Sequence, residues 1–444
     1  MLNPDQARDR ALHVIRAATA AGADAADAVL SVDASTGVSV RLGAVEDVDR
    51  SEGEDLSLRV FVGQRSASVS SSRFDDAELA MLAERAVAMA RLAPEDRWAG
   101  LAPADRLLHG APPDLDLWDG AAFDPQALKD RALAAEDAAR AVEGVTNSEG
   151  GSASVREMVV ALATSTGFSG AYRTTSYSVA ASVISGSGGA MQRDHASHSA
   201  RYQAALDPPE IIGRRAGERA VARMGSSKVA SGAMPIVFDP RVGNGLLGHF
   251  ASAISGGAIA RGTSFLKDML GKPVFAPGVA IHDDPHRPRG LRSKPFDGEG
   301  LPVSPVTLVD GGVLETWLLD SSSARQLGLE PTGHASRGGG VSTSNLYMAA
   351  GTIPRDTLIG DVARGLYVTE VFGQGVNGVT GDYSRGAAGF LIENGELTRP
   401  VAEITIAGNM TEMFARLTPA SDLTFRYGVN VPTLRIDGMT VAGD

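Results

Sequence analysis

The sequence contains no cysteine in its 444 residues. Disulfide bonds, thiolate nucleophiles, iron–sulfur clusters and cysteine-ligated zinc are therefore excluded. Aromatic residues are also scarce, at 5% of the chain, whereas 43% of the residues are hydrophobic and 21% are charged. This length and composition are typical of a soluble globular protein with two or three domains.

An excess of positive charge and a long apolar run are lacking as well. There are 41 basic against 53 acidic residues, a net charge of −12. Proteins that coat nucleic acid need clustered basic residues, so we expect no nucleic-acid partner.

Residues 243–260 contain five glycines, Asn244 and His249, which is too polar for a spanning helix. The first residues lack a signal-peptide core, so we expect a cytoplasmic protein without a membrane.

The N-terminal part shows helical patterns on either side of strand patterns. Residues 4–21 place alanines, Val14 and Ile15 on one helical stripe, and residues 56–62 alternate between apolar and polar side chains. Asp75 begins a second helix that runs to about Leu92. We interpret residues 1–95 as an N-terminal α/β domain.

A second unit of similar composition follows a linker at residues 94–117. Helical patterns at residues 124–142 and 208–224 enclose strand patterns at residues 155–165 and 172–185. These mark a central α/β domain at residues 115–225. The two units are either a degenerate repeat or simply two α/β layers, because no residue pattern visibly recurs.

Glycine becomes dense from residue 229 onward and hairpin signals dominate. Asp310-Gly311 and Asn394-Gly395 each separate two apolar runs and favour type I′ turns. A helix is expected around residues 241–255. We predict an α+β fold with two N-terminal α/β layers followed by a large, mainly antiparallel β domain with a few helices at residues 229–444.

A glycine motif raises the question of nucleotide binding. Gly373-Gln-Gly375-Val-Asn-Gly378 matches GxGxxG and follows the apolar residues 366–372. A dinucleotide site needs a helix directly after this motif. The residues that follow have no helical pattern, so the motif does not indicate such a site.

Two histidine pairs have spacings that a metal site would use. His282 and His286 are four residues apart, but Pro285 disfavours the helix that would bring them together. His195 and His198 sit in a Ser-rich stretch and could hold a metal together with Asp194, but nothing else in the sequence supports such a site. A polar loop is the competing interpretation of the first pair.

The segment 381–389 places four hydrogen-bonding side chains between glycines. These are Asp382, Tyr383, Ser384 and Arg385. Glycine permits close approach of another backbone, so the segment is either a contact site for a peptide or partner, or a bend between strands.

The C-terminal half carries long, ordered motifs that resemble the TldD/PmbA family. The resemblance covers residues 229–444 closely and the upstream units more loosely. The matching motifs are Gly245-Leu-Leu-Gly-His249, Ala253-Ile-Ser-Gly-Gly257, Pro295-Phe-Asp-Gly-Glu-Gly300, Thr316-Trp-Leu-Leu319, Ser323-Ala-Arg-Gln-Leu-Gly-Leu329, Thr332-Gly-His334, Gly373-Gln-Gly-Val, Gly381-Asp-Tyr-Ser-Arg-Gly-Ala-Ala-Gly-Phe390, Glu393-Asn-Gly395 and Glu403-Ile-Thr-Ile-Ala-Gly-Asn409.

Within this family the sequence resembles the PmbA arm, also called TldE. The TldD arm has a His-Glu-x-x-x-His helix and a cysteine near the C-terminus, and it acts as a metalloprotease. Here the motif position reads Asn244, Gly245 and His249, and Tyr427 lies near the cysteine position. One imidazole does not provide the roughly three ligands that a catalytic zinc needs. The resemblance therefore implies no metal and no catalytic residue in this chain.

Two functions follow as alternatives. The first is a non-catalytic subunit that forms a heterodimer with a TldD-like partner, which holds zinc or iron, and contacts unfolded peptides through His249 and residues 382–385. The second is a hydrolase with its own site, built from His249, His282, His286 or residues 382–385. A homodimer of the isolated chain is a further possibility. The family's older label of gyrase modulator finds no support in the net charge of −12. Association is expected through apolar β-domain residues, namely Trp317, Leu318, Phe372 and Phe390.

Overall fold

The computed structural model describes residues 1–121, 124–337 and 339–444. In the N-terminal half the elements are α1 (Pro4–Ala20), β1 (Ala25–Arg41), β2 (Ala44–Val62), β3 (Arg65–Ser71), α2 (Asp76–Leu92), η1 (Ala104–Arg106), α3 (Pro125–Arg140), β4 (Val145–Thr164), β5 (Ser169–Ser185), η2 (Gly188–Ala190), β6 (Gln192–Ala200), η3 (Gln203–Ala205) and α4 (Pro209–Ala222). The four predicted helices are confirmed. Strand β6 and the exposed first half of β2 were not predicted.

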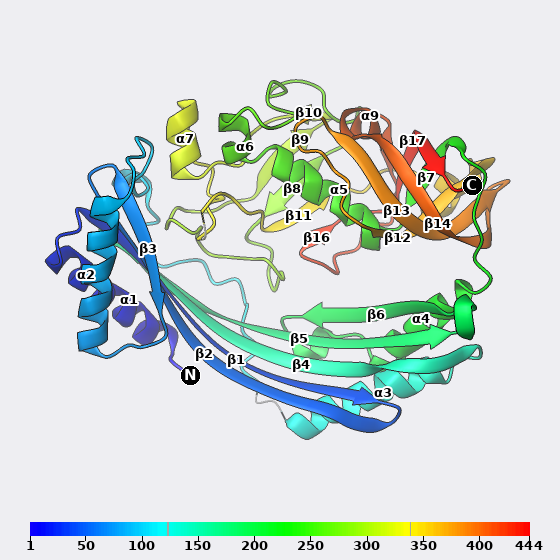
Figure 1. The fold of residues 1–444 in the computed structure, drawn as a ribbon, viewed down its shortest axis with the longest axis horizontal. Coiled ribbons are helices and arrows are strands. Elements are labelled where there is room, and N and C mark those ends of the chain that lie inside the picture. The colour runs from blue at the N-terminus through cyan, green and yellow to red at the C-terminus, as the bar shows by residue number, and fades with distance from the viewer. Residues whose placement is uncertain (122–123, 338) are drawn as a thin grey trace.

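These strands form one long, curved antiparallel sheet (Figure 1). Its order is β3-β2-β1-β4-β5-β6 in the described residues. Each N-terminal unit contributes the same succession of one helix, three strands and one helix, and the units join where β1 pairs with β4. The order of elements is thus repeated even though no residue pattern recurs.

Side-chain alternation along β1 separates the two faces of this sheet. Leu30 packs with α1 and α2, and Val38 and Val40 pack with α3 and α4. Val29 points to the opposite face, toward a cluster that includes Phe296 and Leu301 of the C-terminal half. The helices therefore cover one face, and the C-terminal half contacts the other.

The C-terminal half is mainly β, and its elements are β7 (Gly232–Phe238), α5 (Pro240–Ala253), α6 (Gly256–Ala260), β8 (Ile281–Asp284), β9 (Val306–Asp310), β10 (Val313–Leu314), α7 (Ser321–Leu327), β11 (Asn345–Met348), α8 (Arg355–Gly360), β12 (Arg364–Phe372), β13 (Asp382–Glu393), β14 (Glu396–Asn409), α9 (Met410–Ala415), β15 (Leu417–Pro419), β16 (Val429–Asn430) and β17 (Leu434–Ala442). The overall α+β architecture agrees with the prediction. Both predicted hairpins are confirmed. The second turns at Asn394-Gly395 as predicted, whereas the first turns at Gly311-Gly312, one residue after the predicted pair, because Asp310 still pairs with Val313.

The main C-terminal sheet closes on itself. Its order is β14-β13-β12-β7-β17-β15 in the described residues, and β14 also pairs with β17. Closure leaves five of these strands without a free edge, which removes a template for aggregation. A second sheet of order β10-β9-β8-β11-β16 shares the same hydrophobic core.

Helix α5 lies beside the closed sheet and carries the position of the family's metal motif. Pro240 occupies its first turn, and the Asp239 carboxylate accepts a hydrogen bond from the Arg241 backbone N–H at 2.9 Å. Leu247 and Phe250 anchor the helix in the core. Its other side, which includes His249, is left to face a cavity.

The segment 382–389 belongs to a strand rather than to a loop. It forms the first part of β13, paired with β12 and β14. Its glycines allow this close packing, because a Cβ on Gly389 would lie 1.9 Å from the Tyr367 carbonyl oxygen.

No helix in the described part of the chain is long and apolar enough to cross a membrane.

Candidate functional site

Four of the five predicted contact residues line one cavity. This His249 cavity has a volume of about 1050 Å³ and lies between α5 and the start of β13. His249, Asp382, Ser384 and Arg385 face it, together with residues 373–378, the GxGxxG segment. As expected, no helix follows that segment in the described residues; β13 does.

Tyr383 lies behind the cavity instead of lining it. Alternation along β13 exposes Asp382 and Ser384 and buries Tyr383, which is 3% exposed. Its ring meets His249 edge to face, with 6.3 Å between ring centroids. Burial raises the pKa of Tyr383 to about 12. Tyr383 therefore supports the imidazole and stays protonated at neutral pH.

The cavity combines a neutral imidazole with a cation. Burial, and then the charge of Arg385, lowers the pKa of His249. The Arg385 Nε donates to the Phe372 carbonyl at 3.3 Å, and no carboxylate in the described residues lies within 4.0 Å of its guanidinium. The remaining N–H groups of Arg385 are thus available to an acceptor.

Asp382 is held as a carboxylate at the same cavity. It accepts hydrogen bonds from the Thr380 hydroxyl at 2.6 Å and from the Asn409 amide at 3.3 Å, which lower its pKa. Both oxygens are therefore engaged within the protein. Asp382 shapes the cavity wall more than it offers a proton acceptor.

The residues at this site do not fit a catalytic metal. Asn244 and Gly245 occupy the motif positions on α5, and an added Cβ at Gly245 would meet nothing within 4 Å. Tyr427 lines a different cavity. Across residues 1–121, 124–337 and 339–444, no group of three or more His, Cys, Asp or Glu is arranged to hold a metal ion. His249 has a guanidinium as its charged neighbour, which disfavours a dication.

His282 and His198 have structural partners, whereas the buried His286 Nε2 has no hydrogen-bond partner in the described structure. The His282 Nδ1 lies 3.1 Å from the Thr307 hydroxyl, on β8. His195 and His198 fall on opposite faces of β6, and the His198 Nδ1 accepts from the Asp207 backbone N–H at 2.9 Å. His286 follows β8 and, like His282, is not among the residues that line the His249 cavity in the described structure. His282 and His286 therefore do not join His249 in one site.

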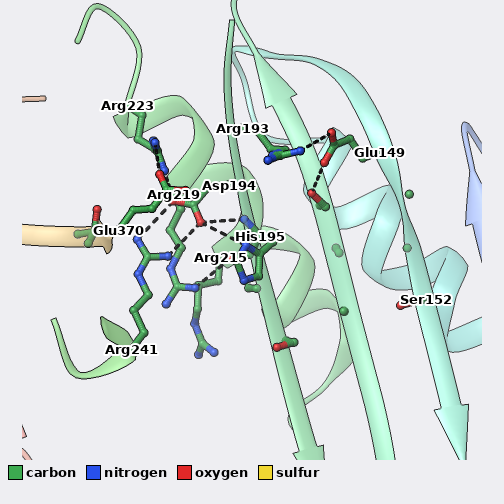
Figure 2. A pocket seen from close by; sticks show the side chains of 18 of the residues that line it. Glu149, Ser152, Arg193, Asp194, His195, Arg215, Arg219, Arg223, Arg241 and Glu370 are labelled. Carbon is green, nitrogen blue, oxygen red and sulfur yellow. Dashed lines mark hydrogen bonds and ion pairs between the residues drawn. The ribbon is translucent and has the colours of Figure 1, made fainter. Parts of the chain in front are cut away.

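A second cavity was not anticipated from the sequence. This arginine cavity has a volume of about 960 Å³ and is lined by residues of β4, β5, β6 and α4 from the N-terminal half and of α5 and β12 from the C-terminal half. Figure 2 shows its charged side chains. Its arginines are Arg193, Arg215, Arg219, Arg223, Arg241 and Arg426. The spacing of residues 215, 219 and 223 by four was the available sequence signal, since it places three cations on one helical face.

Comparison with known proteins identifies the family. Family profiles described as PmbA/TldA metallopeptidase domain 1, central domain and C-terminal domain match residues 26–90, 118–224 and 231–443. The chain is 37% identical to the metalloprotease PmbA of Escherichia coli O157:H7 over 95% of this chain and 92% of that protein. A PmbA homologue from Haemophilus influenzae is also 37% identical, over 97% and 94%.

More distant relatives include the other arm of the family. A TldD homologue from Haemophilus influenzae is 26% identical over 52% of this chain and 53% of that protein. A Bacteroides thetaiotaomicron structure, provisionally described as a modulator of DNA gyrase, covers all of both chains with a TM-score of 0.93 and 29% identity. TldE from Thermococcus kodakarensis covers 98% of this chain and all of that one, with a TM-score of 0.86 and 21% identity, which shows a shared fold. From the three profile matches and the near full-length identity to PmbA proteins, this chain belongs to the PmbA/TldD family of metallopeptidases.

Proposed function

We propose that the chain is the non-catalytic, TldE-like subunit of a heterodimeric TldD/TldE metalloprotease that processes small unfolded polypeptides in the cytoplasm. One observation carries this proposal. The single imidazole on α5, His249, shares its cavity with Arg385 rather than with further metal ligands. The metal, zinc or iron, then belongs to a TldD-like partner.

The chemistry explains why such a chain would need a partner. A metal-bound water needs about three protein ligands around the metal and a group that accepts its proton. Gly245 stands where the general base would be, so this chain has no side chain for that role at α5. A complementary subunit with the complete motif would provide both.

The contribution of this chain is to bind and align the polypeptide. Strand β6 is the last strand in the order of the N-terminal sheet, so its outer edge can accept an extended peptide by β-addition. The exposed apolar side chains of Phe372 and Val379 flank the His249 cavity segment and suit a contact with the partner. We propose that residues 1–95, 115–225 and 229–444 act as the domains of this scaffold.

The family relationships support a pairing of two arms. Haemophilus influenzae has both a PmbA homologue and a TldD homologue, and this chain matches the PmbA homologue over most of its length and the TldD homologue over about half. A chain of the first kind would therefore meet a chain of the second kind in the same cell.

The test compares the purified chain with a reconstituted mixture. We expect the isolated chain to contain well under one zinc or iron per molecule and not to cleave unfolded casein. Addition of a TldD-like partner should produce cleavage that a chelator abolishes. One tightly held metal per isolated chain, lost in His249→Ala, or chelator-sensitive cleavage by the chain alone, would instead support a hydrolase with its own site.

A further inference from the structure

Five of the six arginines of the arginine cavity lie within 4.0 Å of a carboxylate, since Arg193 pairs with Glu149, and Arg215 and Arg426 pair with Asp207. Asp194 pairs with Arg241 at 3.0 Å and with Arg223 at 3.5 Å, and Glu370 pairs with Arg223 at 2.5 Å. Arg219 lies between these groups (Figure 2). Its guanidinium donates to the His195 carbonyl at 3.0 Å and has no carboxylate within 4.0 Å among the described residues.

Two buried polar atoms at the wall lack a partner. The Arg241 Nε and the Thr369 hydroxyl are buried, line the cavity and have no hydrogen-bond partner in the described structure. The Arg241 Nε lies 3.9 Å from the Asp239 carboxylate. Buried polar groups are normally satisfied, so two unsatisfied atoms at one wall single out this cavity. Burial, and then the charge of Arg241, lowers the pKa of Arg219, and a bound anion would relieve this repulsion.

The surroundings of the cavity suit a peptide. Residues 193–197 of β6 line it together with residues 149–152 of β4 and 180–182 of β5, so an extended peptide could lie across these strands beside Arg219. Helix α5 contributes Arg241 to this cavity and His249 to the other one. Eight helical residues rise about 12 Å, which an extended peptide spans with about four residues.

We propose that the arginine cavity binds a carboxylate group of a peptide, with Arg219 as its principal anchor. The planar guanidinium matches a carboxylate with two parallel hydrogen bonds. The inference rests on the proposed function, because it assigns a binding group to the polypeptide that the complex processes. The carboxylate comes either from the peptide C-terminus or from an Asp or Glu side chain.

The test measures binding of labelled peptides to the full chain by fluorescence anisotropy. An unstructured decapeptide without Asp or Glu is compared as the free acid and as the C-terminal amide. Wild type should bind the acid at least tenfold more tightly. Arg219→Gln should lose this difference, whereas Arg214→Gln should retain it, because Arg214 is exposed on α4 and does not line the cavity. If Arg219→Gln fails to fold in a thermal melt, Arg219→Lys should reduce the difference at least threefold, since a lysine cannot bind bidentately.

A further arm identifies the source of the carboxylate. An amidated decapeptide with one internal glutamate should regain the affinity if side chains are bound, and should stay weak if only the terminus is bound. The proposal is overturned if wild type does not discriminate acid from amide, or if Arg219→Gln still does. It is also overturned if inorganic phosphate or a single-stranded oligonucleotide displaces the peptide more effectively than acetate, because the cavity would then be a phosphate site.

The peptide-binding test of the carboxylate site and the cleavage test of the proposed function can fail independently. Discrimination between acid and amide by an isolated chain that never supports cleavage would preserve the carboxylate site and remove the subunit role. Cleavage by the reconstituted complex without such discrimination would do the reverse.

Discussion

His249 occupies a metal-ligand position of its family, yet its neighbours favour a neutral, unliganded imidazole. Burial lowers the pKa of His249, and the charge of Arg385 acts in the same direction. We expect Arg385→Gln to raise the pKa of His249, measured by NMR titration of the imidazole. The melting temperature should hardly change, because substitutions outside the core usually shift stability by under about 0.5 kcal/mol. The control Arg364→Gln removes a charge at the far end of β12 and should leave the titration as it is in wild type. An unchanged titration in Arg385→Gln would show that burial alone sets the pKa.

Glu299 is a buried carboxyl that makes stability depend on pH. It is 8% exposed and accepts hydrogen bonds from the Ser321 backbone N–H at 3.0 Å and hydroxyl at 2.5 Å. Burial raises its pKa from 4.5 to about 7, against the opposing effect of Ser321. The folded state therefore holds this proton more tightly than the unfolded state. The contribution to stability is complete below pH 4.5 and declines as the pH rises toward 7, by up to about 3 kcal/mol.

A neutral side chain at position 299 should remove this pH dependence. We expect Glu299→Gln to be more stable relative to wild type at pH 8 than at pH 5, measured by denaturant unfolding at both values. The exposed Glu396→Gln on β14 is the control and should show a smaller difference. A constant difference between Glu299→Gln and wild type at the two pH values would mean that Glu299 titrates normally.

At the scale of elements, a glycine-to-alanine substitution should lower the stability of the fold in β13 and raise it in α5. Gly389→Ala would place a Cβ 1.9 Å from the Tyr367 carbonyl and push β13 away from β12, at a cost of about 1–3 kcal/mol or more. Gly245→Ala meets no atom within 4 Å and improves the helical propensity of α5 by up to about 1 kcal/mol. Urea unfolding of both variants checks the pair. Equal destabilisation would contradict the packing of β13 on β12.

At the scale of the whole molecule, association with a partner should depend on apolar contact. Trp317 and Leu318, expected at such an interface, are buried in the core at 5% and 1% exposure, so they are not available. Phe372 and Val379 are 48% and 56% exposed. We expect a complex with a TldD-like chain to persist in gel filtration at about 1 M salt, where the Debye length is about 3 Å. Dissociation on adding salt would indicate an electrostatic interface.

Local signals in the sequence determined much of this protein. The sequence predicted the helices from their apolar stripes and the two hairpins from Asp310-Gly311 and Asn394-Gly395. These preferences depend on residues only a few positions apart, so they do not require knowledge of the tertiary structure. His249 and residues 382–385 were predicted as contact residues through the family's motifs, but their position at one cavity was not predicted. The placement of residues 382–385 on a strand, with Tyr383 turned inward, was not predicted either.

Only the tertiary structure decided the features that depend on distant segments. Strand β6 and the first half of β2 lack apolar alternation, so they are strands because β5 and β1 present backbone partners to them. The arginine cavity joins α4, β6 and α5. Folding gathers there arginines that are up to 233 positions apart, from Arg193 to Arg426, although the chain as a whole has a net charge of −12. Composition averages over the whole chain, whereas binding depends on which charges share one water-filled space.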